Sequence, residues 1–192
     1  MSGEEETVRE AQEVESLIAG MARSIWEGRR VDAPFFLVGV RSRGVPLAQR
    51  LARELGALAA GEIAVGAVDI TLYRDDLSQG QRWPVLRGTE IPFSVDGAEL
   101  VLVDDVLFTG RTVRAALNAI CDLGRPERIR LAVLVDRGHR QLPIQPDVVG
   151  LHLPTALGDR IRVRLHPMDP DEEIVRVLAA SRSAATKRRP AP

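Results

Sequence analysis

The sequence predicts an α/β fold with a mainly parallel central sheet flanked by helices. The main evidence is a unit that occurs twice, at residues 35–56 and 99–124: an apolar run of strand length, a polar turn, and a segment with the apolar spacing of an amphipathic helix. Further strand-like apolar runs lie near 129–135 and 147–151. Apolar runs without alternation are typical of parallel strands covered on both faces, so these four segments are expected in one sheet.

The remaining elements follow from spacing and from helix-ending residues. A helix is expected over about residues 7–28, because five apolar residues share one face at helical spacing: Val14, Leu17, Ile18, Met21 and Ile25. Gly56 and Gly124 are expected to end the helices of the two repeated units. Residues 161–165 alternate apolar and polar side chains, which indicates a late strand, whereas residues 172–180 fit a strand or a helix.

Composition limits the class of protein. The chain has 192 residues, of which 45% are hydrophobic and 28% charged, with a net charge of −1; a single soluble domain over residues 1–180 is therefore expected. The charge balance excludes a uniformly basic nucleic-acid binder but leaves room for a local basic face. Residues 181–192 carry Arg182, Lys187, Arg188 and Arg189 without an acid, which predicts a disordered basic tail.

Membrane and disulfide signals are missing from the sequence. No apolar stretch reaches the length of a membrane span, and the N-terminus is acidic rather than basic, so neither a membrane partner nor a signal peptide is expected. The one cysteine, Cys121, cannot form an intrachain disulfide, which fits the cytoplasm, and is expected to be a small core residue of its helix.

The most informative segment is the second repeated unit. The apolar run Leu100–Val103 is followed by two adjacent acids, Asp104 and Asp105, and then by a turn with Thr109, Gly110 and Thr112 before a helix. Open α/β sheets bind ligands at the carboxyl ends of their strands, and a helix N-terminus favours anions. No lysine is present for a Walker A loop. Incidental acids are the alternative, but side-by-side carboxylates are costly without a hydroxyl or cation partner.

The first repeated unit carries a basic turn at the matching position. Arg41, Ser42, Arg43 and Gly44 follow the apolar strand 35–40, and Pro46 lies near the start of the next helix. Two arginines and several backbone amides suit a dense anion, although a solvated basic turn is the alternative.

These segments match the signature of type I phosphoribosyltransferases, and three runs, at residues 69–78, 100–112 and 131–143, closely resemble the PyrR family. Members of that family are pyrimidine-operon attenuation regulators that also act as uracil phosphoribosyltransferases. The resemblance covers roughly residues 35–170. It implies the type I phosphoribosyltransferase fold, with a small hood and a flexible hairpin loop over the site.

The resemblance also implies roles for individual residues. Asp104 and Asp105 would hold the ribose hydroxyls of 5-phosphoribosyl-1-pyrophosphate (PRPP), and with Arg43 they are the expected catalytic residues. The expected PRPP-binding segment consists of Val101, Leu102, Val103, Asp104, Asp105, Val106, Leu107, Phe108, Thr109, Gly110, Arg111 and Thr112. Pyrophosphate would bind at Arg41, Ser42, Arg43 and Gly44.

Uracil is expected beyond the strand 129–135, at Val135, Asp136 and Arg137, where a salt bridge is the alternative role for the Arg137 side chain. Tyr73 and Arg74 are candidates for the closing loop. Mg²⁺ is the expected cofactor, bound through PRPP and waters rather than by a dedicated set of protein ligands. The resemblance further implies UMP and UTP as ligands and a homodimer or higher homo-oligomer.

The RNA-binding part of the resemblance is less complete than the catalytic part. Pyrimidine leader mRNA is the expected RNA partner, with Arg23, Arg140, His152 and Thr155 as candidate contacts, but Leu151 stands where the family pattern has a lysine. Two alternatives therefore remain at this point: an RNA-binding nucleotide sensor with little catalysis, and a phosphoribosyltransferase for a purine base.

Overall fold

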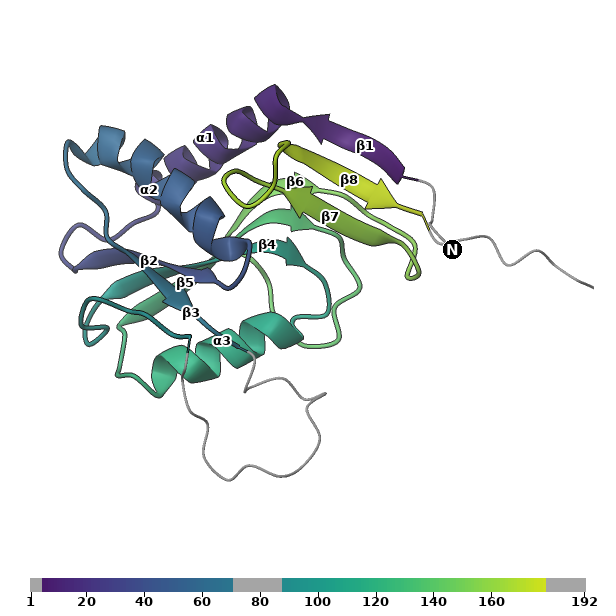
Figure 1. Ribbon diagram of the computed structural model, residues 1–192. Coiled ribbons are helices and arrows are strands. Elements are labelled where there is room, and N and C mark those ends of the chain that lie inside the picture. The colour runs from purple at the N-terminus through teal and green to yellow at the C-terminus, as the bar shows by residue number, and fades with distance from the viewer. Residues whose placement is uncertain (1–4, 71–87, 179–192) are drawn as a thin grey trace, which may run out of the picture.

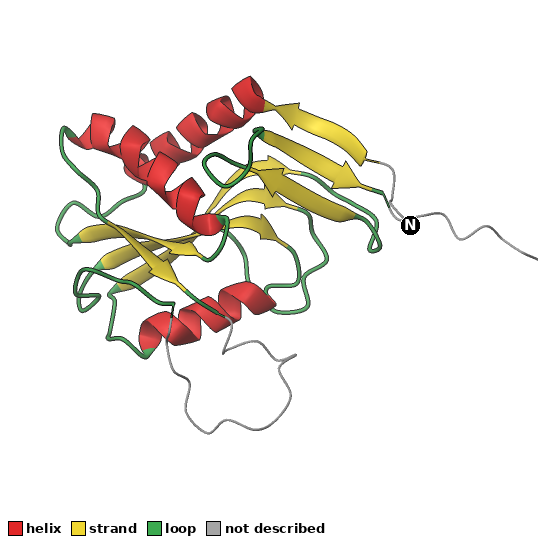
Figure 2. Cartoon of the chain, in the orientation of Figure 1, coloured by secondary structure: helices red, strands yellow, loops and turns green. Residues whose placement is uncertain are grey.

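The computed structural model of the protein describes residues 5–70 and 88–178 (Figure 1). Its centre is a five-stranded sheet in which all strands run parallel, in the order β3-β2-β4-β5-β6. Helices α1 and α2 cover one face of this sheet and α3 covers the other, as Figure 2 shows in red and yellow. The bounds of these elements are β2 (Phe35–Val40), β3 (Val65–Val68), β4 (Glu99–Leu107), β5 (Arg128–Asp136), β6 (Val148–His152), α1 (Ala11–Glu27), α2 (Gly44–Ala59) and α3 (Arg111–Cys121). The predicted fold class is confirmed.

Burial on both faces of the central sheet explains why its strands are apolar without alternation. Val101 and Val103 of β4 belong to the core under α1 and α2, whereas Leu100 and Leu102 belong to the core under α3. All four side chains are fully buried. Because successive residues of a strand point to opposite faces, a strand covered on both sides needs apolar residues at every position.

A second, three-stranded antiparallel sheet lies next to the carboxyl ends of the central strands (Figure 1). We call it the hood sheet; it consists of β1 (Glu5–Glu10), β8 (Glu173–Val177) and β7 (Arg160–Arg164), in that order. The strand predicted at 161–165 is therefore confirmed, and residues 173–177 form a strand rather than a helix. The sheet is built from the two ends of the described chain, not from the insertion between the repeated units where a hood was expected.

The helix predicted from residue 7 is wrong at its start. Residues 5–10 pair with β8, and the helix begins only at Ala11. Local spacing did not indicate this strand, because its pairing partner lies more than 160 residues away in the sequence.

Three smaller expectations are also corrected. Strand β4 does not end at Val103 but runs to Leu107, so the two acids lie within the strand rather than after it. Helix α2 continues past Gly56 to Ala59 and ends at Ala60 in the left-handed conformation, and α3 ends before Gly124, at Cys121. Cys121 is exposed rather than part of the core, because it occupies the outer face of the last turn of α3.

Two predicted features fall outside the described residues: the hairpin with Tyr73 and Arg74, and the basic tail 181–192. Within the described ranges, none of the helices is long and apolar enough to span a membrane.

Candidate active site

The two acids lie where β4 extends beyond its neighbour β2. The parallel pairing of β2 with β4 ends at Gly39 and Val103, while β4 continues its pairing with β5 through Asp104 and Val133. Past this point the chain that leaves β2 becomes the basic turn, so one side of β4 is free of a pairing strand at Asp104 and Asp105. This is the position at which open parallel sheets expose a ligand-binding crevice.

Both acids are in an unfavourable electrostatic environment. Asp104 is only 6% exposed, and its Oδ1 accepts a hydrogen bond from the Asp105 backbone N–H at 3.0 Å. Burial, with the neighbouring Asp105 charge as the second cause, raises the pKa of Asp104 well above its ordinary value. Burial also raises the pKa of Asp105, although the charge of Arg43 acts in the opposite direction. A ligand that brings hydroxyl donors or a cation would relieve this cost.

The basic turn packs directly against β4. A Cβ atom added to Gly44, the first residue of α2, would lie 2.4 Å from the Val103 carbonyl oxygen and 3.4 Å from the Asp104 Cα. Only glycine permits this approach. The segment expected to bind pyrophosphate and the segment expected to bind ribose are therefore adjacent.

The side chains of the turn differ in their contacts. Arg43 pairs with Asp169 through its Nη2, at 3.0 Å from Oδ1, and Asp169 in turn accepts a hydrogen bond from the Leu165 N–H. Arg41 is more exposed: its Nε donates to the Gly88 carbonyl at 2.6 Å and its Nη2 lies 3.3 Å from Glu90. Ser42 is exposed. Arg43 is thus the arginine of the turn whose charge reaches Asp105.

The turn after β4 is suited to an anion. Gly110 precedes α3 with a φ of 90°, a left-handed conformation that favours glycine. The first N–H groups of α3 have no partner within the helix, and the helix dipole is positive at this end. Two backbone N–H groups, of Gln141 and Leu142, donate to the Thr109 carbonyl at 3.0 and 3.2 Å. These bonds hold the turn against the segment after β5.

The segment expected to bind uracil is fixed by its own ion pair. Val135 is fully buried, and Asp136 ends β5. Burial alone would raise the pKa of Asp136, but hydrogen bonds from Arg140 and from the Gly138 N–H hold that pKa below its ordinary value. Arg140 contacts Asp136 at 2.6 Å and also donates to the carbonyls of Phe108 and Ile144. Arg140, expected to contact RNA, is therefore bonded within the site.

Arg137 joins three segments. Its guanidinium carbon lies 4.1 Å from the centre of the Phe108 ring, its Nε donates to the Thr155 hydroxyl at 3.0 Å, and its Nη2 donates to the Ala156 carbonyl at 3.1 Å. Nη1 carries none of these bonds. Its contacts in the described residues are neutral acceptors and a ring rather than a salt bridge.

Of the other residues expected to bind RNA, Arg23 lies apart from this cluster, whereas His152 and Thr155 touch its edge: His152 Nδ1 lies 3.9 Å from Asp136 Oδ2, and Thr155 accepts a hydrogen bond from Arg137. Arg23 is exposed on α1, and His152 at the end of β6 has a side chain that is 74% exposed. Helix α1 packs against β6, because Met21 meets Gly150, and the two exposed residues come from these neighbouring elements. Thr155 is half-buried by its bond to Arg137.

Sequence reasoning missed two residues of this region. Asp169 pairs with Arg43 across 126 positions, and nothing in its local sequence marks that contact. His139 has a φ of 62°, its Nε2 lies 2.7 Å from the Thr155 carbonyl oxygen, and its ring meets Phe108 edge-on. The available signal was the glycine directly after a strand, because glycine at such a place indicates a turn with a positive φ.

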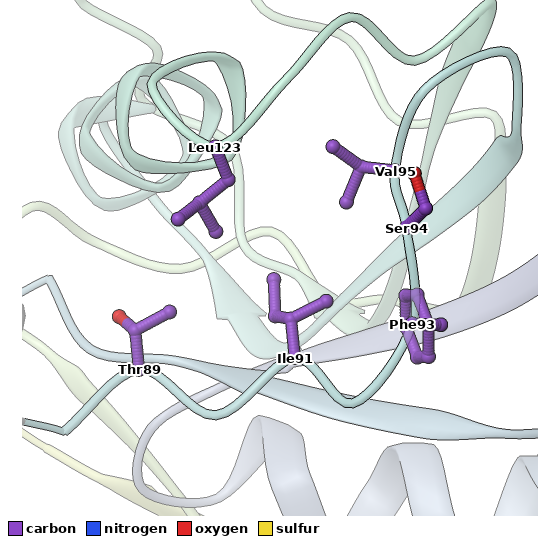
Figure 3. Close-up of a pocket in the computed structure, with 6 residues that line it drawn as sticks. All are labelled: Thr89, Ile91, Phe93, Ser94, Val95 and Leu123. Atoms are coloured by element: carbon purple, nitrogen blue, oxygen red, sulfur yellow. The ribbon is translucent and has the colours of Figure 1, made fainter.

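A separate cavity of about 270 Å³ lies elsewhere (Figure 3). Ile91, Phe93, Val95 and Leu123 provide apolar walls, with hydroxyls from Thr89 and Ser94. Leu123 follows the C-terminus of α3, so this cavity is at the opposite end of that helix from Gly110. It presents no charged side chain, which makes it unsuitable for a phosphorylated ligand.

The fold, the adjacent acids of β4, the basic turn and the N-terminus of α3 are those of a phosphoribosyltransferase. The family model described as phosphoribosyl transferase domain matches residues 5–159. The chain belongs to the PyrR family within this class: it is 51% identical to the bifunctional protein PyrR of Chloroflexus aurantiacus, over 90% of this chain and 95% of that protein. It is 49% identical to the bifunctional protein PyrR of Pelotomaculum thermopropionicum, over 91% and 97% of the two chains.

Solved structures support the fold independently. A hypoxanthine phosphoribosyltransferase of Trypanosoma cruzi, in a ternary complex with substrates, is similar over 92% of this chain and 96% of its own, with a TM-score of 0.69 and 20% identity. The hypoxanthine phosphoribosyltransferase of Staphylococcus aureus has a TM-score of 0.63 at 13% identity, over 80% and 79% of the chains. At such identities the likeness shows the shared fold alone.

Proposed function

We propose that this protein transfers the phosphoribosyl group of PRPP to uracil, giving UMP and diphosphate, and that it also regulates pyrimidine genes by binding leader mRNA in response to uridine nucleotides. The observation that carries the enzymatic part is the pair of adjacent acids, Asp104 buried and Asp105 half-buried, beside the basic turn and the turn before α3. About half of the residues are identical to those of bifunctional PyrR proteins, which supports both parts.

Each group has a role that follows from its place. Asp104 and Asp105 accept hydrogen bonds from the ribose hydroxyls, and their negative charge favours the positive charge that develops on the sugar as the bond to pyrophosphate breaks. The N–H groups at the start of α3 bind the 5′-phosphate. Arg43 and the amides of the basic turn bind pyrophosphate, and the Arg137 guanidinium at the end of β5 contacts the base.

The two acids also fit Mg²⁺. Carboxylate oxygens are hard ligands, and a nearby cation would offset the cost of burial that raises the pKa values of both acids. The residues that the structure describes contain no group of three or more side chains that could hold a metal ion. When bound there, Mg²⁺ neutralises charge on the leaving pyrophosphate.

The regulatory part rests on the exposed residues beside the site. Arg23 and His152 offer cationic or hydrogen-bonding groups on adjoining elements, and Thr155 accepts a hydrogen bond from Arg137. Leu151, at the position of the family lysine, packs against the core under α1 and offers no charge to a phosphate. We therefore expect RNA affinity to depend on Arg23 more than on that position.

The direct test incubates the purified protein with uracil, PRPP and Mg²⁺ and measures UMP and diphosphate. We expect the double variant Asp104→Asn/Asp105→Asn to lose nearly all turnover while staying folded. The control Asp122→Asn removes an exposed acid at the far end of α3 and should keep wild-type turnover. Full activity in the double variant would refute the ribose-binding role.

The same assay with hypoxanthine and guanine in place of uracil tests base choice, which the fold neighbours leave open. The second candidate function is an RNA-binding nucleotide sensor with little catalysis, favoured by the bifunctional character of the relatives. Gel shifts with the pyrimidine leader, with and without UMP, separate the two: RNA binding without UMP formation would support the sensor.

A further inference from the structure

Arg43 stands between two acids that come from different parts of the chain. Its Nη2 contacts Asp169 at 3.0 Å, and its charge acts on Asp105. The arginine side chain is 32% exposed and that of Asp169 only 16%, so the pair is half-buried with the acid as the inner partner. Nε of Arg43 is buried without a hydrogen-bond partner among the described residues. Within the described part of the chain, the ion pair with Asp169 is therefore the contact that orients the guanidinium.

Asp169 is itself held in place. Its Oδ2 accepts the Leu165 N–H at 3.0 Å, and its own backbone N–H donates to the Leu165 carbonyl at 3.0 Å. Leu165 is fully buried. Asp169 thus belongs to a closed turn in the segment 165–172, which joins β7 to β8 of the hood sheet.

The same segment has a second ionic link to α2. Arg50 donates from Nη1 to Glu172 at 2.5 Å, and Glu172 also accepts the His166 N–H. Arg50 lies two turns further along α2 than the basic turn. The segment 165–172 therefore makes two ionic contacts here: Glu172 pairs with Arg50 of α2, and Asp169 pairs with Arg43 of the basic turn.

We propose that Asp169 is a positioning residue for pyrophosphate binding: it holds one edge of the Arg43 guanidinium so that the other edge faces the crevice beside Asp105. This inference rests on the proposed function, because it takes Arg43 as a pyrophosphate contact. Arginine has a flexible side chain and loses rotamer freedom when it binds an anion. A carboxylate that orients the guanidinium beforehand lowers that cost, as outer partners do for binding groups elsewhere.

The opposite role for Asp169 is competition, in which the acid occupies Arg43 and pyrophosphate must displace it. The geometry favours positioning, because Asp169 contacts Nη2, while Nε is buried without a hydrogen-bond partner among the described residues, so the guanidinium retains hydrogen-bonding capacity for a ligand. The two roles predict opposite signs. Loss of a positioning acid weakens pyrophosphate binding, whereas loss of a competing acid strengthens it.

The experiment titrates the full-length protein with pyrophosphate and Mg²⁺ by calorimetry and measures the Michaelis constants (KM) for PRPP and uracil. Asp169→Ala is expected to weaken pyrophosphate binding and to raise the PRPP KM by roughly tenfold, the order for one charge-assisted hydrogen bond. The uracil KM should change by less than about twofold, since base contacts are untouched.

Two further variants separate orientation from loop stability. Asp169→Asn keeps an oxygen for the Leu165 N–H but removes the charge that faces Arg43, so it should behave like the alanine variant, whereas Asp169→Glu should recover part of the affinity. Glu172→Ala is the matched control: it breaks the neighbouring link to Arg50 and should lower the melting temperature without changing pyrophosphate affinity.

Unchanged or tighter pyrophosphate binding in Asp169→Ala would overturn the inference, and so would an equal loss of affinity in Glu172→Ala. Because the titration needs no turnover, it also distinguishes failure of the proposed function from failure of the positioning role. Failure of the wild-type protein to form UMP would speak against the proposed function, whereas equal pyrophosphate affinity in wild-type and Asp169→Ala protein would speak against positioning only.

Discussion

At the scale of single residues, holding the like charges of Asp104 and Asp105 side by side lowers the stability of the folded protein. Asp104 is buried and its nearest ionisable neighbour is another acid, so the folded protein favours its protonated form. Arg43 offsets part of this cost at Asp105 but is itself shared with Asp169. Sites that destabilise the free protein in this way are common where a ligand supplies the missing partner.

This arrangement predicts a pH-dependent gain in stability for Asp104→Asn. A carboxyl group whose pKa is raised by folding contributes stability that is complete below its unfolded value near 3.8 and is lost as the pH rises through the folded value. Asparagine does not ionise. We therefore expect equal melting temperatures near pH 4 and a higher one for the variant at pH 8, by a few degrees if the gain is about 1 kcal/mol.

Asp32→Asn serves as the control of opposite sign. The hydrogen bond from Arg30 lowers the pKa of Asp32, so this acid stabilises the fold above its unfolded pKa, and its loss should lower the melting temperature at pH 8. A variant Asp104→Asn that is no more stable than the wild type at pH 8 would show that the buried acids are already compensated in the free protein.

How much of the site the sequence predicts depends on the separation of its parts. Asp104, Asp105 and the turn through Thr112 are neighbours in the sequence, and the structure brings them together with the basic turn through Gly44. The partners of the arginines were not predictable in this way. Arg43 meets Asp169, and Arg137 meets Thr155 and Phe108, across separations that no local pattern encodes. Arg140 is a residue type expected at the surface, yet its guanidinium bonds to Asp136 and to the Phe108 carbonyl.

At the scale of elements, the site depends on how closely α2 approaches the central sheet. The start of α2 lies against the carbonyl end of β4, with no room for a side chain at Gly44. Strand–helix units with an apolar strand and a glycine in the turn are recognisable from sequence. Strand β1 is not, because residues 5–10 are mostly polar and exposed and form a strand only through pairing with β8.

Gly44→Ala is expected to damage stability and substrate binding together. The new methyl group would lie 2.4 Å from the Val103 carbonyl oxygen, and neither backbone can move freely, so a cost of roughly 1–3 kcal/mol is expected. Displacement of the basic turn from Asp104 should also raise the PRPP KM.

The control is Gly20→Ala within α1, where a Cβ atom meets nothing within 4 Å. It should raise stability by roughly 0.5–1 kcal/mol, because alanine favours the helix. Thermal melts and PRPP kinetics of both variants check the contrast. A Gly44→Ala protein with wild-type PRPP kinetics would mean that the turn is not positioned by this contact.

At the scale of the whole molecule, charged groups are buried at both ends of the central sheet but differ in their purpose. At the carboxyl ends Asp104 and Asp105 lie side by side, and the charge of Arg43 acts on Asp105. At the amino ends Glu99 is fully buried, its Oε2 accepts the Arg30 N–H at 2.6 Å, and Arg128 and Arg130 each lie 3.7 Å from its Oε1. Arg130 also donates to the Ile25 carbonyl near the end of α1. In this second cluster two cations lie near the buried acid, and the cluster joins α1 to the sheet.

This difference between the two ends of the sheet predicts that Arg130→Met reduces stability and leaves catalysis intact. Removal of one partner leaves Glu99 buried with less compensation, which typically costs about 3–5 kcal/mol, and the Ile25 carbonyl loses its donor. The PRPP and uracil KM values should stay within about twofold, because the cluster lies at the opposite end of β4 from Asp104. The double variant Glu99→Gln/Arg130→Met should lose less stability than the sum of the single variants, since the two groups interact. A rise in PRPP KM comparable to that of Gly44→Ala would instead show that the two ends of the sheet are coupled.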